Sequence, residues 1–154
     1  MTAVVKNLSA RDIPSVLEIS VECGLCLWSA EAYLSELTRD DSIMLKLTGD
    51  DHPVVGFAVG RIFDLGSNGF TVELTNIGLR KTFRNQGLGT KLLKAFIEKC
   101  RSAAVSAVVL EVRVSNSSAI SFYKNNGFRS TGRRRRFYSN PLEDGITMRL
   151  ILRD

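Results

Sequence analysis

One short segment of the chain has the composition and the position of an anion-binding loop. It consists of Arg84, Asn85, Gln86, Gly87, Leu88, Gly89 and Thr90, and it lies between a strand-like run and a strongly amphipathic segment. The first amides of a helix have no intrahelical acceptors and carry an effective charge of about +0.5, so they can bind a diphosphate. Gly87 and Gly89 would leave those amides uncovered, and Arg84 would add a charged donor.

The spacing of the glycines separates this loop from two common phosphate-binding motifs. It has neither the Gly-Lys-Ser/Thr ending of a Walker loop nor the Gly-x-Gly-x-x-Gly of a dinucleotide fold. Taken alone, the loop is equally compatible with a tight turn from a strand into a helix. Cofactor binding here therefore needs support from the rest of the sequence.

Hydrophobic patterning predicts the helices that would hold this loop. The segment 87–104 has apolar residues at the spacing of a helix packed on a core, namely Leu88, Leu92, Leu93, Phe96, Ile97 and Cys100. Earlier in the chain, Pro14 favours the start of a helix that Gly24 ends, and Ser29 can cap a second helix over 29–38. A further short helix over 117–127 ends at Gly127.

Runs rich in β-branched and aromatic residues predict the strands. They cover residues 4–7, 42–48, 53–63, 70–79, 106–114, 128–138 and 145–152, and the turn-forming cluster 49–52 should join the second and third as an antiparallel hairpin. The resulting order is β, α, α, β, β, β, α, β, α, β, β. We therefore predict an α/β (α+β) fold with one domain over residues 1–154.

Composition supports one domain outside the membrane. A chain of 154 residues with 44% hydrophobic and 24% charged residues can bury one core but has no room for a second domain. No apolar run reaches the roughly 18 residues of a membrane helix. The N-terminus lacks the features of a secretory signal and the cysteines are odd in number, so we predict a cytoplasmic protein. The net charge of +5 suits an anionic cofactor, an acidic substrate or a ribonucleoprotein partner without choosing among them.

Two motifs together resemble the GNAT superfamily of N-acetyltransferases. The family's Arg/Gln-x-x-Gly-x-Gly/Ala signature, which binds the pyrophosphate of coenzyme A, is matched by Arg84, Gly87 and Gly89. A later Asn-x-x-Ala-x-x-x-Tyr element followed by Gly-Phe is matched by Asn116, Ala119, Tyr123, Gly127 and Phe128. The resemblance covers nearly the whole chain and implies acetyl-coenzyme A as the co-substrate, with its pyrophosphate at residues 84–90.

The resemblance also implies an architecture and a mechanism. The central mixed, mostly antiparallel sheet would splay between strands 75–79 and 108–112, and pantetheine would pair with the backbone of Ile77, Gly78 and Leu79. Glu111 matches the position proposed to take the proton from the acceptor amine, and Tyr123 matches the acid that protonates the departing thiolate. Asn116 is expected to cap a helix and to touch the cofactor. No covalent enzyme intermediate is required.

The acceptor is less well defined than the cofactor. Within the superfamily, four segments are most similar to bacterial enzymes that acetylate the N-terminal alanine of a ribosomal protein: LWS (27–29), TNIGL (75–79), LEVRVSN (110–116) and RRRFY (134–138) followed by EDGI. An α-amine with a pKa of about 8 is about one-tenth neutral at pH 7, whereas a lysine with a pKa of about 10.4 is below one in a thousand. A protein N-terminus is therefore the implied acceptor. A small-molecule amine is the alternative, because acceptor sites vary across the superfamily.

Two further groups of residues have competing interpretations. Glu73 is a rival base, because strict alternation along its strand would put it on the same face as Ile77 and Leu79. Cys23 and Cys26 have the spacing of half a zinc knuckle. With one further cysteine and one histidine in the chain, a four-ligand site has no clear completion, so we predict no metal.

A run of consecutive arginines is the densest charge cluster. Arg133, Arg134, Arg135 and Arg136 are expected either to form a solvated strand edge or to border the substrate groove, with Trp28 and Tyr33 as its opposite wall. Direct binding of nucleic acid through this run is the weaker alternative. A noncatalytic acyl-coenzyme A sensor is disfavoured, because the chain keeps both Glu111 and Tyr123.

Overall fold

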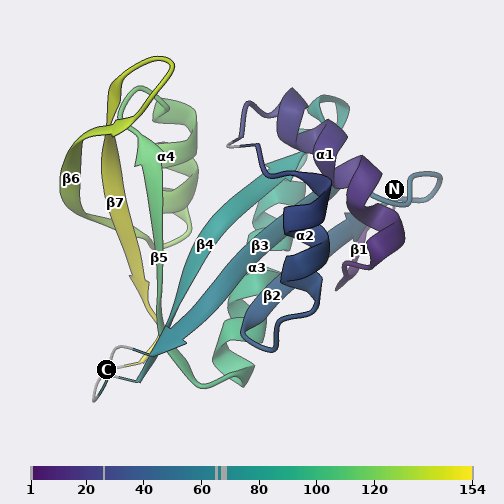
Figure 1. Cartoon of the computed structure of the whole chain (residues 1–154), viewed down its shortest axis with the longest axis horizontal. Helices are drawn as coiled ribbons and strands as arrows, with labels where there is room; N and C mark the ends of the chain where they lie inside the picture. The colour runs from purple at the N-terminus through teal and green to yellow at the C-terminus, as the bar shows by residue number, and fades with distance from the viewer. Residues whose placement is uncertain (1, 26, 65, 67–68, 154) are drawn as a thin grey trace.

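One mixed sheet organises the chain, and helices pack on both of its faces (Figure 1). The computed structural model describes residues 2–25, 27–64, 66 and 69–153. Over these residues the strands are β1 (Val4–Asn7), β2 (Ser42–Thr48), β3 (Gly56–Asp64), β4 (Phe70–Leu79), β5 (Val105–Arg113), β6 (Arg129–Tyr138) and β7 (Glu143–Ile151). The α-helices are α1 (Ile13–Glu22), α2 (Ala30–Leu37), α3 (Leu88–Ser102) and α4 (Ser117–Asn125), with short 3-10 turns at Ala10–Asp12 and Lys81–Phe83. The predicted order of strands and α-helices is confirmed.

The predicted helix boundaries depend on local capping groups that the structure shows. Ser29 and Asn116 each accept a hydrogen bond at 3.1 Å from the amide three residues further on. Gly24, just after α1, has a φ of 63°, in the left-handed region where helices commonly end. β3 begins at Gly56 rather than at residue 53, although Val55 already donates to the Leu47 carbonyl of β2 at 2.8 Å.

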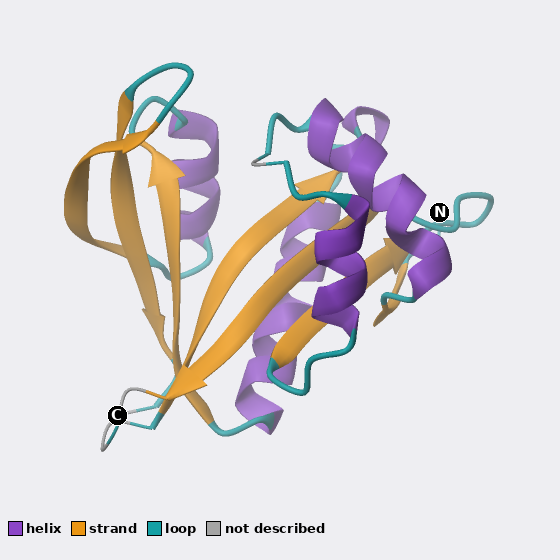
Figure 2. Cartoon of the chain, viewed as in Figure 1, coloured by secondary structure: helices purple, strands orange, loops and turns teal. Residues whose placement is uncertain are grey.

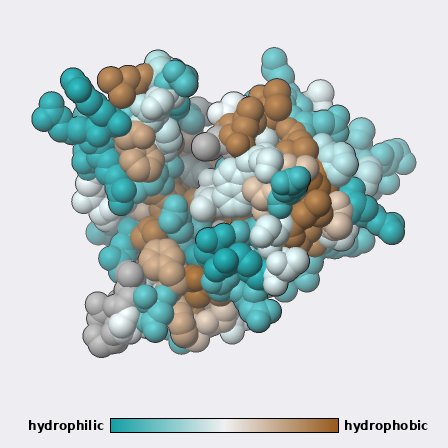
Figure 3. Space-filling model, viewed as in Figure 1, coloured by the Kyte–Doolittle hydropathy of each residue, from teal (hydrophilic) through white to brown (hydrophobic). Residues whose placement is uncertain are grey.

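The helices cover the two faces of the sheet unequally. α1 and α2 pack on β2, β3 and β4, where the buried cluster is Leu8, Ile13, Val16, Ile19, Tyr33, Met44, Val54, Phe57 and Val59. α3 and α4 pack on the opposite face over a larger core that includes Val72, Leu92, Phe96, Val108 and Met148. On the face that carries α1 and α2, no described helix covers β5, β7 and β6 (Figure 2). This uncovered half is mainly hydrophilic in the same view (Figure 3).

The strands β4 and β5 separate halfway along their length. The strand order is β1-β2-β3-β4-β5-β7-β6, and among the described strands β4 and β5 form the one parallel pair. Their pairing stops at Glu73 with Val109, although β4 continues to Leu79, whereas β5 stays paired with β7 through Arg113. The sheet therefore opens into a V between β4 and β5 (Figure 1), which confirms the predicted splayed, mostly antiparallel architecture.

A bulge interrupts the alternation of side chains along β4. Thr75 is the extra residue, because its two neighbours lie opposite consecutive residues of β3. Glu73 is exposed between two residues of the α3 core and so points to the face that carries α1 and α2. Ile77 and Leu79, beyond the bulge, pack against the α3 core. The prediction that Glu73 shares their face is wrong, because it assumed an uninterrupted period of two.

A buried ion pair joins the start of α1 to β2. Asp12, which is 4% exposed, accepts hydrogen bonds from Lys46 Nζ at 2.9 and 3.0 Å and from the Ser9 amide at 2.8 Å. Burial by itself raises the pKa of the Asp12 carboxyl, but these donors outweigh burial and hold the pKa below its usual value. A lowered pKa adds stability that is complete above about pH 4, where an unfolded Asp titrates, and that is lost as the pH falls through the native value.

Lys46→Met is expected to lower the free energy of unfolding at pH 7 by about 3 kcal/mol, because it leaves the buried Asp12 carboxylate without its cation. The difference from wild type should be smaller at pH 3, because the unfolded Asp12 is then mostly protonated and the wild type loses part of the stability that its lowered pKa adds. Urea denaturation at pH 7 and pH 3 measures both values. Lys94→Met, at an exposed position of α3, is the control and should change stability by less than about 0.5 kcal/mol. An equal loss at both pH values would contradict the role of the ion pair.

Candidate active site

The predicted anion-binding loop leads directly into α3. Gly87 is the N-cap residue of α3 and has a φ of 78°, and Asn85 has a φ of 62°. A glycine cap has no side chain that could accept from the helix, so the first amides of α3 keep no intrahelical acceptor. A Cβ at Gly87 would meet no described atom within 4 Å. The start of α3 is therefore open, and its amides at residues 88–90 fit a diphosphate.

Two residues of the loop point toward the fold. Arg84 donates from Nε to the Leu79 carbonyl at 3.2 Å and from an Nη to Cys23 Sγ at 3.3 Å, so its guanidinium secures the loop to the end of β4. A Cβ at Gly89 would lie 3.5 Å from Phe122 and 3.6 Å from Leu79, which are ordinary packing distances. The charged donor predicted from the sequence thus already has protein acceptors, and Gly89 faces α4.

The remaining loop residues contribute more backbone than side chain. Asn85 and Gln86 are exposed, and Leu88 and Thr90 are half-buried. Gln86 donates to the carbonyl of Thr82 at 3.2 Å, which ties the loop to the preceding 3-10 turn. The structure therefore brings residues 84–90 together as one loop whose open donors are main-chain amides.

The end of β4 presents backbone groups at the opening of the sheet. Ile77, Gly78 and Leu79 pair with β3 on one side but lie beyond the last residue that pairs with β5 on the other. A Cβ at Gly78 would lie 2.8 Å from Cys23 Sγ, so the glycine allows α1 to approach β4 closely. The edge of β4 that faces β5 can thus pair with an extended ligand, at the position predicted for pantetheine.

Glu111 lies on β5 at this opening. Its neighbours Leu110 and Val112 are buried in the α3 core, so alternation directs Glu111 to the face that carries α1 and α2. The side chain is 17% exposed, Oε2 accepts from Thr147 Oγ1 at 3.0 Å, and Oε1 lies 3.0 Å from Arg134 Nε. Thr147 is directly opposite on β7, and Arg134 comes from β6. A carboxylate here can accept a proton from an amine bound on the uncovered half of the sheet.

Tyr123 comes from α4 and is nearly buried. Its ring lies 5.4 Å from that of Phe122 and 5.5 Å from that of Phe128, measured between centroids. Burial raises the pKa of Tyr123 well above its usual value, with a smaller contribution from Tyr138. The hydroxyl therefore keeps its proton throughout the neutral range, as an acid that protonates a leaving group requires.

Three groups that shape the site were missed in the sequence. Thr147 holds the candidate carboxylate, the Arg113 guanidinium lies 4.6 Å from the ring centroid of Tyr138, and Cys23 donates to the Leu79 carbonyl at 3.2 Å. These contacts join residues on different elements, so no local spacing predicts them. The alternation of β7 around the buried Met148 could have predicted the face of the sheet on which Thr147 lies, but not its pairing with β5.

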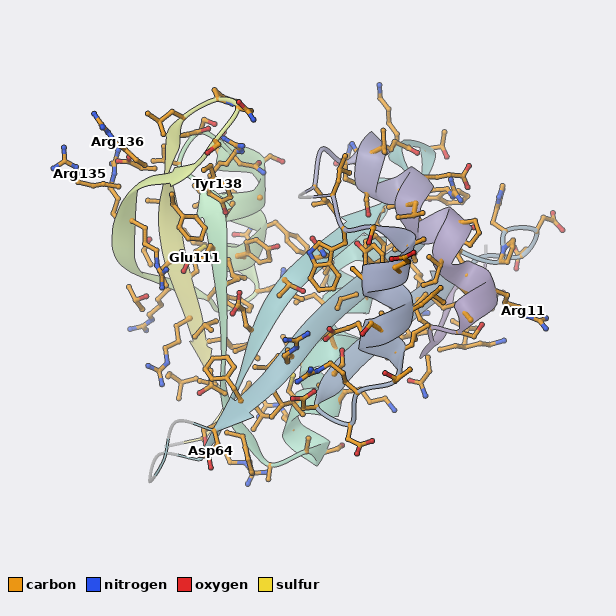
Figure 4. All side chains as sticks on the ribbon, viewed as in Figure 1. Arg11, Asp64, Glu111, Arg135, Arg136 and Tyr138 are labelled. Carbon is orange, nitrogen blue, oxygen red and sulfur yellow. The ribbon has the colours of Figure 1, made fainter. Side chains whose placement is uncertain are left out.

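The four consecutive arginines of β6 have different surroundings. Arg133 pairs with Asp144 at 2.6 Å, and Arg134 pairs with the candidate base. Arg135 and Arg136 point away from the molecule (Figure 4). They lie in an irregular stretch of β6 where Arg136 has a φ of 53°. Arg135 and Arg136 therefore lie on a solvated edge, whereas Arg133 and Arg134 each form an ion pair with a carboxylate.

Neither a metal cluster nor a membrane-crossing helix is found in the described part of the chain. No group of three or more His, Cys, Asp or Glu side chains there could hold a metal ion. Cys26, which with Cys23 has the spacing of half a zinc knuckle, lies outside the described residues. Burial raises the pKa of Cys100 to about 12, so this core thiol stays protonated. The described helices are too short or too polar to cross a membrane.

The sheet thus opens beside the start of α3, where no side chain accepts from the first amides. The chain belongs to the acetyltransferase (GNAT) family, whose profile matches residues 13–128. This membership confirms the resemblance inferred from the two motifs.

Individual relatives make the similarity more specific. The chain is 32% identical over 146 residues to the ribosomal protein bS18-alanine N-acetyltransferase of Salmonella typhimurium, and the match covers 93% of each chain. The crystal structure of the ribosomal-protein-alanine N-acetyltransferase from Escherichia coli is similar with a TM-score of 0.85 at 27% identity, covering 99% of this chain and 96% of that one. The structure of Ard1 from Thermoplasma volcanium matches with a TM-score of 0.87 at 27% identity over all of both chains.

Gly87→Val is expected to weaken coenzyme A binding about tenfold, because a β-branched residue strains the left-handed cap that presents the amides of α3. Isothermal titration calorimetry with coenzyme A measures the affinity. Gly66→Val is a matched control, since Gly66 also has a positive φ, of 86°, and a Cβ there would likewise meet no described atom within 4 Å. Both variants should lose similar stability. An unchanged affinity for coenzyme A in Gly87→Val would contradict pyrophosphate binding by the amides at the start of α3.

Proposed function

We propose that this protein transfers the acetyl group of acetyl-coenzyme A to the N-terminal α-amine of a polypeptide, and that the acceptor is the N-terminal alanine of a ribosomal protein. The observation that carries this proposal is the similarity, over 93% of both chains, to the Salmonella typhimurium enzyme whose name states that activity. An α-amine also meets the chemical requirement of the reaction, because a useful fraction of it is neutral at pH 7. A ribosomal acceptor places the protein in the cytoplasm.

The residues at the opening of the sheet fit the cofactor. Bound acetyl-coenzyme A supplies the acetyl group as a thioester. The amides beyond Gly87 would hold its pyrophosphate, and the backbone of Ile77, Gly78 and Leu79 would hold its pantetheine. Asn116 uses its side-chain oxygen to cap α4, which leaves the amide nitrogen as a donor to the cofactor.

Two side chains would accept and donate the protons of the reaction. Glu111 receives the proton of the attacking amine, directly or through a water, and Thr147 keeps the carboxylate oriented. Tyr123 holds the proton that the leaving sulfur needs, because its burial keeps the hydroxyl protonated. Direct transfer requires no nucleophilic side chain, in keeping with the protonated Cys100 thiol.

A panel of acceptors tests this function. Purified protein with acetyl-coenzyme A should acetylate peptides that start with alanine, and mass spectrometry should place the acetyl group on the α-amine. The same peptides with a blocked N-terminus are the matched control and should remain unmodified. Turnover confined to small amines such as polyamines or amino sugars would overturn the proposal and favour the small-molecule alternative.

A further inference from the structure

The carboxylate that we assign as the base already forms an ion pair with a cationic side chain. Glu111 Oε1 lies 3.0 Å from Arg134 Nε, and Oε2 accepts from Thr147 Oγ1 at 3.0 Å. One carboxylate oxygen therefore has a hydrogen-bond donor and the other has an ion-pair partner in this structure. An acceptor amine that approaches Oε1 has to compete with Arg134. Arg134 is the exposed partner of the pair, at 61% against 17% for Glu111.

We propose that Arg134 is a positioning residue that holds Glu111 in a paired resting state until the acceptor amine takes its place. This inference rests on the proposed function, in which Glu111 receives the amine proton. A guanidinium remains charged and has no acceptor, so Arg134 cannot take that proton itself. Release of Arg134 therefore exposes Oε1 to the incoming amine.

The local structure of β6 allows this release. β6 is the edge strand of the sheet, and its register with β7 shifts between Arg134 and Tyr138. The segment that follows Arg134 is thus not held by a regular ladder. The Arg134 guanidinium lies 5.3 Å from the ring centroid of Phe137, so the ring can keep it close when it leaves Glu111.

The other charged groups on this face do not perform the same task. Arg113 pairs with Glu143 at 3.2 Å and lies over the ring of Tyr138. Glu73 lies on β4, and Arg149 is two residues beyond Thr147 on β7. Among the described residues, Arg134 is the cation that forms an ion pair with Glu111.

Steady-state kinetics test the inference. At saturating acetyl-coenzyme A, Arg134→Gln should lower the KM for an alanine-starting peptide about threefold without lowering kcat. The effect is small because an exposed ion pair contributes little free energy. Arg135→Gln removes a neighbouring arginine that points outward and should leave KM unchanged. In a Glu111→Gln background the Arg134→Gln change should have no effect, because the two residues act through one contact.

Several outcomes would overturn the inference. An unchanged or higher KM in Arg134→Gln would overturn it. An equal fall in KM caused by Arg134→Gln in the wild-type and Glu111→Gln backgrounds would also overturn it. Arg134→Lys, which keeps a charge but loses the planar donor, should give a KM between those of wild type and Arg134→Gln. If the Glu111→Gln background is too slow for kinetics, calorimetry of peptide binding with coenzyme A present makes the same comparison. If wild type accepts no peptide, the proposed function fails, and the series run with the amine that is accepted still tests Arg134.

Discussion

Tyr123→Phe is expected to lower kcat about 100-fold while leaving the affinity for coenzyme A within about twofold. The substitution keeps the ring, which contacts Phe122 and Phe128, and removes only the hydroxyl. Because burial raises the pKa of Tyr123, wild type holds a proton there throughout the neutral range. The variant has no such proton for the departing thiolate, whereas the loop that would bind the pyrophosphate is unchanged.

Separate measurements distinguish this chemical role from a packing role. Stopped-time assays give kcat, calorimetry gives the dissociation constant for coenzyme A, and thermal unfolding reports stability. Phe128→Leu disturbs the packing around the same ring and is the control. It should lower the free energy of unfolding by about 1–2 kcal/mol and have a much smaller effect on kcat. A Tyr123→Phe enzyme as fast as wild type would assign the acid elsewhere.

Glu111→Gln is expected to lower kcat/KM for an alanine-starting peptide about 100-fold at pH 7. Glutamine keeps the shape of the side chain and an oxygen that can accept from Thr147, but it cannot take a proton from the amine. The loss should partly recover at pH 9, because an α-amine with a pKa of about 8 is then mostly neutral without a base. Rates measured from pH 6 to pH 9 for both enzymes show this recovery.

Glu73→Gln is the matched comparison for the base. Glu73 is an exposed carboxylate on β4, on the same face of the sheet as Glu111 but before the bulge. We expect it to keep activity within about threefold of wild type, as for a surface substitution away from the chemistry. A large loss in Glu73→Gln with little change in Glu111→Gln would exchange the two assignments. Small losses in both would point to water as the base.

Much of the fold could be predicted because the signals are local. The apolar stripe from Leu88 to Cys100 predicts one face of α3, since a helix brings residues three and four apart together. Ser29 caps α2 through the amide three residues later, a contact that depends only on neighbours in the chain. The V between β4 and β5 came from the family resemblance and not from residue patterning.

The bulge and the loop show where local patterns fail. Alternation placed Glu73 on the wrong face, because one inserted residue at Thr75 shifts every later side chain of β4. The composition of the loop did not indicate that the Arg84 guanidinium contacts Leu79 and Cys23, and its contact with a phosphate stays a prediction. A sequence motif shows that a charged residue is present but not which neighbour is nearest to it.

The family, the order of the elements and the loop that starts α3 could all be inferred from the amino-acid sequence, because each depends on residues close together in the chain. The surroundings of Glu111 depend instead on the folded sheet. Thr147 reaches it from 36 residues away and Arg134 from a third strand, through the pairing of β5, β7 and β6. Strand register sets such contacts, and a shift of one residue would turn each side chain to the opposite face.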